Sequence, residues 1–298
     1  MKRRSEILSD LVPLRRGPAP GRLAVHLVVA VGILLSGFAT REHAQAQTTP
    51  RTQSRGYRET GAATGGTIAG VVRFNGAVPP SETYPVTKDR HVCGSGRPSP
   101  RLLVGPGGGV RNAVVMIKEI AEGKKIDRSV ALVLNQRRCE YAPHVSAFVT
   151  GTKFEILNSD PILHSVHAYN YTGGSASMFN IAQPMRGQRT SITDAQLCSS
   201  GIIAVTCDAG HPWMNAYIVV SEHPYVAVTD ERGAFRLGDV PPGTYVVRMW
   251  HEGVKILRKE MESNAVKKYS YEEPYVEEQT VTVPAHGSVT ISFTLALR

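Results

Sequence analysis

The chain has 298 residues, of which 42% are hydrophobic and 20% are charged. This composition excludes a fully disordered chain and a multi-span membrane protein, and the length allows about two domains. The formal net charge is +9, but the first 46 residues carry seven Lys/Arg and three Asp/Glu, which leaves +5 over the rest. A mild excess scattered along the chain does not make a nucleic-acid-binding surface, so we expect no nucleic-acid partner.

Residues 1–46 show the features of a secretory signal peptide in their usual order. Basic residues are spread over 1–22, an apolar run follows at 23–39, and Ala44 and Ala46 provide small residues at a cleavage site. This order predicts that the rest of the chain is exported. The alternative is an uncleaved anchor, because the apolar run is near the lower length limit for spanning a bilayer. Only in that case do we expect contact with a membrane.

The rest of the chain alternates short apolar runs with turn residues. Residues 47–64 are polar and unpatterned, which favours a flexible linker. Runs rich in β-branched residues then recur to residue 220, and a second unit begins near His223. Regular short strands with turns between them predict an all-β protein built of sandwiches. Residues 253–276 are charged and poorly patterned, and we interpret them as an inserted loop.

The strongest chemical signal is a loop that carries three different metal-ligand side chains. Cys207, His211 and Met214 lie between the strands expected at 202–206 and 215–220. Thiolate and thioether favour Cu(I), imidazole accepts both oxidation states, and a weak axial Met tunes the potential. A short loop held by two strands keeps these ligands nearly fixed. The loop therefore predicts a site for one copper ion that cycles between Cu(I) and Cu(II).

Such a site needs a second imidazole from another strand. A strand expected at 153–157 ends in a turn at Asn158, and the chain then presents His164 and His167. Residues three apart in an extended chain point to opposite faces, so the two imidazoles cannot share one centre without a bend. We expect His164 to be the ligand.

These motifs resemble the cupredoxins, the plastocyanin-like blue copper proteins. Asn158 and His164 match the Asn-x5-His element, and the loop matches Cys-x3-His-x2-Met between the last two strands. The resemblance implies a Greek-key cupredoxin-like sandwich over residues 65–222. It also implies a mononuclear site, because the binuclear copper centre of cytochrome oxidase needs a further Cys where this chain has Ile203.

The ligand set that this resemblance implies has three main members and one weak one. His164, Cys207 and His211 are the main ligands, and Met214 is the axial ligand. The sequence Cys139 to Val145 also resembles a Cys-x-Tyr-x-Pro-His-Val element of exported bacterial methylamine-utilisation-like proteins, which implies a periplasmic location.

Residues 223–298 resemble the carboxypeptidase regulatory-like, or transthyretin-like, domain. The residues that carry this resemblance are Thr229-Asp230, Gly233, Phe235, Val240-Pro241-Pro242-Gly243 and Tyr245. The resemblance implies a smaller, non-catalytic β-sandwich. By the same resemblance, His251 and Glu252 have structural roles.

The four cysteines leave two interpretations open. In an exported protein the default is two disulfides, for example Cys93–Cys139 together with Cys198–Cys207. We expect Cys93–Cys139 to be the structural bridge, which leaves Cys207 for the metal. The pairing of Cys198 with Cys207 remains the alternative, and it would remove the thiolate.

Other residues near the expected site are candidates for supporting contacts. Asn158, His167 and Trp213 could lie around the ligands, and His144 or His167 could also touch the metal. A lone His near a core is more often a hydrogen-bonded structural residue than a ligand.

Three functions compete. The first is an electron carrier between exported redox proteins, which four protein ligands favour over catalysis. The second is a copper-delivery protein or a copper enzyme, either of which needs an exchangeable metal or an open coordination position. The third is a metal-free structural or binding module. We expect the electron carrier, and therefore no enzymatic activity.

Overall fold

The computed structural model describes residues 56–61, 64–197 and 200–298. The expected signal peptide and most of the expected linker lie outside these residues. The described part is all-β, as expected, and its one α-helix is the short α1 (Arg90–Cys93). Within it, no helix has the length and hydropathy needed to cross a membrane.

Nine consecutive strands form the first of two sandwiches, here called the inserted sandwich. Its sheets have the orders β13-β10-β7-β8 and β12-β11-β14-β15-β9. The strands are β7 (Ala131–Arg137), β8 (Glu140–Ala142), β9 (Val145–Val149), β10 (Lys153–Asn158), β11 (His164–Asn170), β12 (Ala176–Gln183), β13 (Arg189–Ile192), β14 (Gly201–Thr206) and β15 (Asn215–Ser221). The pairs β7–β10 and β9–β15 are parallel. Parallel neighbours cannot be joined by a tight hairpin, so the chain crosses between the two sheets.

Alternating burial along the strands gives this sandwich its core. In β10, Phe154 and Ile156 are buried and their neighbours are more exposed. Ile203 of β14 and Ile218 of β15 belong to the same buried cluster, although they come from the other sheet. Apolar side chains at every second position of both sheets therefore meet between them, which is the packing of a β-sandwich.

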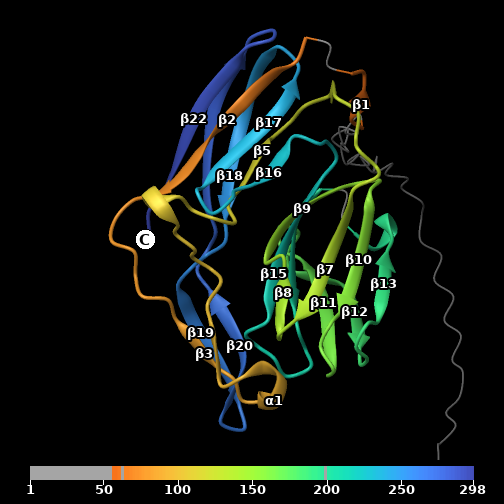
Figure 1. The fold of residues 1–298 in the computed structure, drawn as a ribbon, viewed down its shortest axis with the longest axis vertical. Coiled ribbons are helices and arrows are strands. Elements are labelled where there is room, and N and C mark those ends of the chain that lie inside the picture. The colour runs from red at the N-terminus through yellow and green to blue at the C-terminus, as the bar shows by residue number, and fades with distance from the viewer. Residues whose placement is uncertain (1–55, 62–63, 198–199) are drawn as a thin grey trace, which may run out of the picture. The chain divides into compact units, whose positions relative to one another are not determined.

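Seven further strands form the second sandwich, here called the framing sandwich. Its sheets have the orders β16-β5-β18-β21 and β17-β2-β22 (Figure 1). The strands are β2 (Gly66–Phe74), β5 (Val114–Ile117), β16 (Val226–Val228), β17 (Ala234–Val240), β18 (Gly243–His251), β21 (Tyr275–Val283) and β22 (Ser288–Leu295). Their buried side chains form a core of their own around Ile68, Val115, Phe235 and Phe293.

The strand pairing differs from the expected division of the chain at residue 222. Strands β2 and β5 come before that boundary, yet β2 pairs with β17 and β22, and β5 pairs with β16 and β18. Pairing between strands more than a hundred residues apart leaves no mark on the local hydrophobic pattern. The inserted sandwich thus lies, in chain order, between two neighbouring strands of the framing sandwich.

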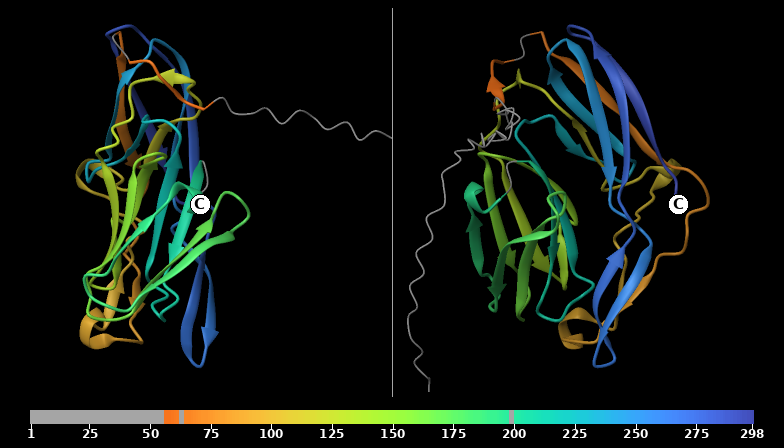
Figure 2. Two further views of the ribbon diagram at one scale, coloured as in Figure 1. Left: turned by 90° about the vertical axis from the view of Figure 1, so that its right-hand side faces the viewer. Right: turned by 180° about the vertical axis from the view of Figure 1, so that it is seen from behind.

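Two small hairpins and α1 pack against the buried core of the inserted sandwich. The segment expected to be a loop at 253–276 forms a hairpin of β19 (Ile256–Glu262) and β20 (Ala265–Tyr271), and β3 (Thr83–Pro85) pairs with β4 (Gly96–Pro98) (Figure 2). The rings of Tyr84 and Tyr269 are 4.9 Å apart. The remaining elements are the parallel pair β1 (Arg58–Glu59) and β6 (Glu122–Gly123), and the short helices η1 (Pro106–Gly108) and η2 (Asp194–Gln196).

A buried ion pair joins the two sandwiches. Glu252, directly after β18, lies 2.6 Å from Arg101 and also contacts Nε2 of His144, which lies between β8 and β9. Arg101 and Glu252 are each only 1–2% exposed. Burial opposes the charged form of Glu252, but the Arg101 charge and the His144 hydrogen bond hold the pKa of its carboxyl below the usual range. Glu252 therefore makes a structural contact. Because His144 is hydrogen-bonded to Glu252, its Nε2 is not available to a metal.

We predict that Glu252→Ala lowers the free energy of unfolding by about 3–5 kcal/mol, because it leaves the buried Arg101 guanidinium without its counter-charge. Urea unfolding monitored by fluorescence measures this loss. The matched control is Glu278→Ala, which breaks partly exposed pairs with Lys118 and Arg248 and should change stability little. Equal losses in the two variants would contradict the prediction.

Candidate metal centre

Side-chain alternation brings the predicted ligands to one end of the core. Strand β14 buries Ile203 and Val205, and Cys207 continues that series just past the strand end. His164 is the first residue of β11 and is buried. Met214 directly precedes β15 and is buried as well. Strand period and strand ends together thus place three of the four predicted ligands in the same buried layer.

Three donor atoms converge on one point. Nδ1 of His164 and Nδ1 of His211 are 3.1 Å apart, and they lie 4.0 and 3.5 Å from Sγ of Cys207. A point in the plane of the three atoms is about 2.1 Å from each of them, which matches metal–nitrogen and metal–sulfur bonds of roughly 2.0–2.3 Å. Both imidazoles are 0% exposed and Cys207 is 5% exposed. The geometry therefore fits a first-row metal ion.

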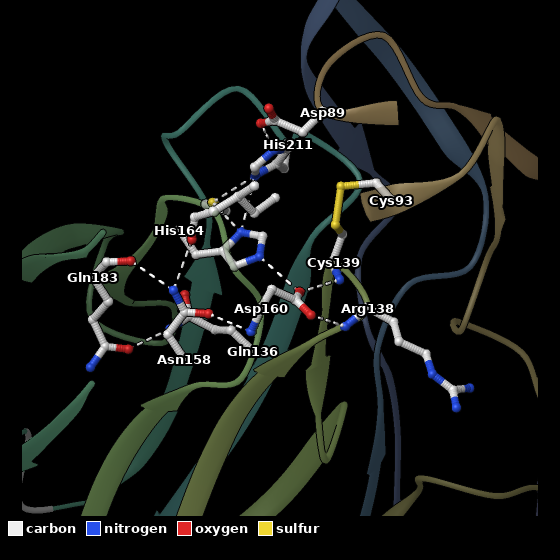
Figure 3. Close-up of polar contacts among 12 residues, drawn as sticks. Asp89, Cys93, Gln136, Arg138, Cys139, Asn158, Asp160, His164, Gln183 and His211 are labelled. Carbon is white, nitrogen blue, oxygen red and sulfur yellow. Dashed lines mark hydrogen bonds and ion pairs between the residues drawn. A yellow bond between two sulfur atoms is a disulfide. The ribbon is translucent and has the colours of Figure 1, made fainter. Parts of the chain in front are cut away.

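A carboxylate fixes the orientation of each imidazole. Nε2–H of His164 donates to Oδ2 of Asp160 at 3.0 Å, and Nε2–H of His211 donates to Oδ2 of Asp89 at 2.9 Å (Figure 3). With the protons on Nε2, each Nδ1 turns a lone pair toward the other imidazole and toward the sulfur. Three electron-pair donors that face each other in a buried space are stabilised by a cation.

Asp160 is itself held by the chain around it. Its carboxylate accepts the backbone N–H groups of Arg138 and Cys139 at 2.8 and 2.7 Å. Oδ1 of Asn158 accepts the backbone N–H of Asp160 at 2.9 Å, and the Asn158 amide donates to the carbonyl of Gln183. Asn158 thus shapes the turn that carries Asp160.

The charges in the metal-free site balance one another. Burial opposes ionisation of Cys207, but hydrogen bonds from His164, His211 and the Ser165 N–H outweigh it and lower the pKa of the thiol to about 6. Burial likewise opposes a charge on His164, yet Asp160 and Cys207 raise the pKa of its imidazole to about 9. Without metal, a proton on His164 therefore neutralises the thiolate.

Met214 and Trp213 lie beside the donor triangle in sequence and in the core. Both belong to the buried cluster that contains Cys207. The Trp213 ring centroid is 5.2 Å from that of His211, and its Nε1–H donates to the carbonyl of Cys139 at 3.1 Å. Trp213 thus contacts a predicted ligand and is hydrogen-bonded to the β7–β8 turn.

The two other candidate histidines point elsewhere. His144 bonds Glu252 and the carbonyl of Asn215. His167 contacts Asp208 through Nδ1 and Ser177 through Nε2, on the outer face of β11. The opposite orientation of His164 and His167 follows from their spacing of three along an extended strand.

The expected disulfide Cys93–Cys139 is confirmed, and Cys207 carries a free thiol. Cys198 lies outside the described residues. A second group of potential ligands, Cys139, Asp160 and His164, shares an imidazole with the first. In the oxidised protein Cys139 is part of the disulfide, so it supplies no thiolate there.

The sequence interpretation missed the two carboxylates. Asp160 stands four residues before His164, in the turn already associated with the ligand, so its position was a usable signal. Asp89 is 122 residues from His211, and only the fold brings them together.

Comparisons with known proteins give a limited result. No protein-family model and no curated protein match the chain. Similar solved structures include a Cu-containing nitrite reductase from Thermus scotoductus SA-01, which is 19% identical over 36% of this chain and 25% of the reductase, with a TM-score of 0.26. This chain therefore spans only a quarter of the reductase.

Two smaller proteins align over nearly their whole length. A purple cupredoxin from Nitrosopumilus maritimus is 19% identical over 31% of this chain and 99% of its own, with a TM-score of 0.26. Amicyanin from Paracoccus versutus is 16% identical over 36% of this chain and 97% of its own, also with a TM-score of 0.26. At these TM-scores the likeness supports no inference about the site, whose chemistry follows from its own side chains.

We predict that the thiolate of Cys207 in the metal-free protein appears with a midpoint near pH 6 instead of the ordinary value of about 8.5. Because the folded-state pKa is depressed, this group stabilises the fold at higher pH, and that contribution is lost as the pH falls through about 6. Ultraviolet thiolate absorbance of the wild type minus that of Cys207→Ser measures the midpoint. A value at or above that of a free thiol would refute the prediction.

Proposed function

We propose that the protein binds one copper ion through His164, Cys207 and His211, with Met214 as a weak axial ligand. The observation that carries the proposal is the triangle of two imidazole nitrogens and one thiol sulfur around a point about 2.1 Å from each. A trigonal His₂Cys set with a long thioether contact is typical of copper sites that transfer electrons. Copper bound there supplies a one-electron couple between Cu(I) and Cu(II).

The chain supports electron transfer by keeping the ligands still. Asp160 and Asp89 orient the two imidazoles, and the backbone N–H of Ser165 donates to Sγ of Cys207 at 3.4 Å. Ligands held in this way move little between oxidation states, which lowers the rearrangement needed when an electron arrives or leaves. Their burial also excludes water from the donor atoms.

The same burial favours an electron carrier over the alternatives. A copper enzyme needs a coordination position that a substrate can reach, and a delivery protein needs ligands that release the metal readily. Here His164 and His211 are fully buried and each is hydrogen-bonded at its second nitrogen. We therefore propose single-electron transfer between exported redox proteins, in an oxidising compartment such as the periplasm, where the Cys93–Cys139 bridge persists.

We predict that one equivalent of Cu(II) gives the purified protein an intense thiolate-to-copper absorption band that bleaches reversibly with reductant. Cys207→Ser should abolish the band, because it removes the only proposed sulfur anion. Cys198→Ser is the matched control and should retain it. A wild type that stays colourless would favour the metal-free structural or binding module. A weak tetragonal spin-resonance signal would favour a delivery protein or an open site. Colour in Cys207→Ser would refute the ligand assignment.

We predict that Met214→Leu keeps the colour and shifts the reduction potential. A weak axial donor tunes the potential of such a site, so its replacement by an apolar side chain changes the relative stability of Cu(I) and Cu(II). Spectroelectrochemistry measures the shift, with Met185→Leu as a control, because Met185 is 67% exposed. An unchanged potential in Met214→Leu would exclude the axial role and leave an open fourth position.

A further inference from the structure

A short hairpin with a helical tip covers the His211 side of the site. This segment, here called the cap, comprises residues 83–98, with β3 and β4 as its strands and α1 at its tip. Asp89 precedes α1 and accepts the hydrogen bond from His211. The neighbouring Lys88 donates to the carbonyl of Ala209 at 2.6 Å, in the loop that carries the ligands Cys207 and His211.

The cap is bound to the opposite side of the site by a covalent bond. Cys93, the last residue of α1, forms the disulfide with Cys139 in the turn between β7 and β8. The backbone N–H of Cys139 donates to Asp160, the carboxylate that orients His164. Figure 3 shows this chain of contacts from Asp89 and His211 to the disulfide and on to Asp160 and His164.

The carboxylates of Asp89 and Asp160 are therefore connected through α1, the disulfide and the backbone of Cys139. The backbone N–H of Cys93 donates to the carbonyl of Asp89 at 2.9 Å, which fixes the aspartate relative to the disulfide. Asp89 has φ 52°, in the left-handed region that non-glycine residues other than Asn and Asp seldom adopt. In this conformation the carboxylate of Asp89 accepts the hydrogen bond from the buried imidazole of His211.

The outer side of the cap is also covered. The hydroxyls of Tyr84 and Tyr271 are 3.1 Å apart, and Tyr84 packs on Tyr269 of the β19–β20 hairpin. Arg97 of β4 forms an ion pair with Glu140 of β8. The cap is thus fastened at its tip by the disulfide and along its strands by the hairpin and the inserted sandwich.

We propose that Asp89 and Asp160 are positioning residues for the two ligand imidazoles, and that the Cys93–Cys139 disulfide holds Asp89 on His211 so that bound metal is retained. This inference rests on the proposed function, since it requires a metal at His164, Cys207 and His211. A carboxylate on the second nitrogen makes an imidazole a stronger donor and fixes its orientation, and loss of such a partner commonly weakens metal binding about 10–100-fold.

The bridge makes retention of the metal depend on the state of the disulfide. A dithiol reductant that attacks the bridge leaves as its own disulfide, and Cys93 and Cys139 each gain a thiol proton. The covalent bond between α1 and the β7–β8 turn is then broken. The cap keeps only its non-covalent contacts, so Asp89 leaves His211 more often.

The first experiment compares copper-loaded wild type with Asp89→Asn and Asp160→Asn. Asn tolerates the left-handed conformation of residue 89, so the first variant preserves the backbone while removing the charge. Asp127→Asn, an exposed position bonded to Ser129, is the control. We expect both site variants to lose copper to a chelator about 10–100-fold faster and to have raised reduction potentials.

Three outcomes are informative. A coloured wild type whose site variants keep its potential and release rate overturns the positioning role alone. A wild type that forms no coloured complex overturns the proposed function and, with it, the role in metal retention. A lowered melting temperature without a change in potential would mean that the carboxylates only support the fold.

The second experiment is a double-mutant cycle between the disulfide and Asp89. Cys93→Ser/Cys139→Ser should speed copper release, and adding Asp89→Asn should increase the rate little further, because both changes remove the same contact. Asp160→Asn added to the disulfide-free protein is the comparison, and it should still increase the rate of copper release, because the proposed link runs through Asp89. If Asp89→Asn speeds copper release as much in the disulfide-free protein as in the wild type, the proposed link between the bridge and Asp89 is wrong.

Discussion

The site depends on one arrangement: two imidazole lone pairs and a sulfur that face each other where water is excluded. Neither nitrogen can turn away, because each ring is held at its far side by a carboxylate, Asp160 for His164 and Asp89 for His211. Buried donor atoms that face one another without a partner are energetically unfavourable, and a proton or a metal ion between them removes that cost. The metal-free protein uses a proton on His164, whose pKa is raised to about 9, and the thiolate of Cys207 is its partner. A metal ion would replace that proton without moving the rings.

Much of the arrangement of the proposed ligands was predictable because it follows from local rules. Period-two alternation places Cys207 and Met214 in buried layers that continue β14 and β15, and a spacing of three sends His167 to the outer face of β11. Asn158 was selected from its motif, and it shapes the turn at Asp160. These features depend on a few neighbouring residues, so the sequence contains what is needed to find them.

The features that were missed depend on contacts between distant segments. Asp89 meets His211 only because β3, α1 and β4 fold over the end of the inserted sandwich. The hairpin at 256–271 was expected to be a loop. Its strands are charged and mostly exposed, so the sequence shows no alternation of apolar and polar residues that would indicate strands. The pairing of β2 with β17 and β22 could not be derived either, since many β-branched runs of similar length compete as partners.

The position of the inserted sandwich in the chain has a consequence for how the protein can be made and divided. Met116 of β5 lies opposite Val226 of β16, so everything between them is, topologically, one very long loop of a β-hairpin. During synthesis, β2 and β5 emerge first but must wait for partners that are translated last, and meanwhile their edges are open to aggregation. A truncation after residue 222 would leave both strands in that state permanently. The strands from β7 to β15 pair only with one another, so excision of that internal segment would cut none of the other ladders in the described part of the chain.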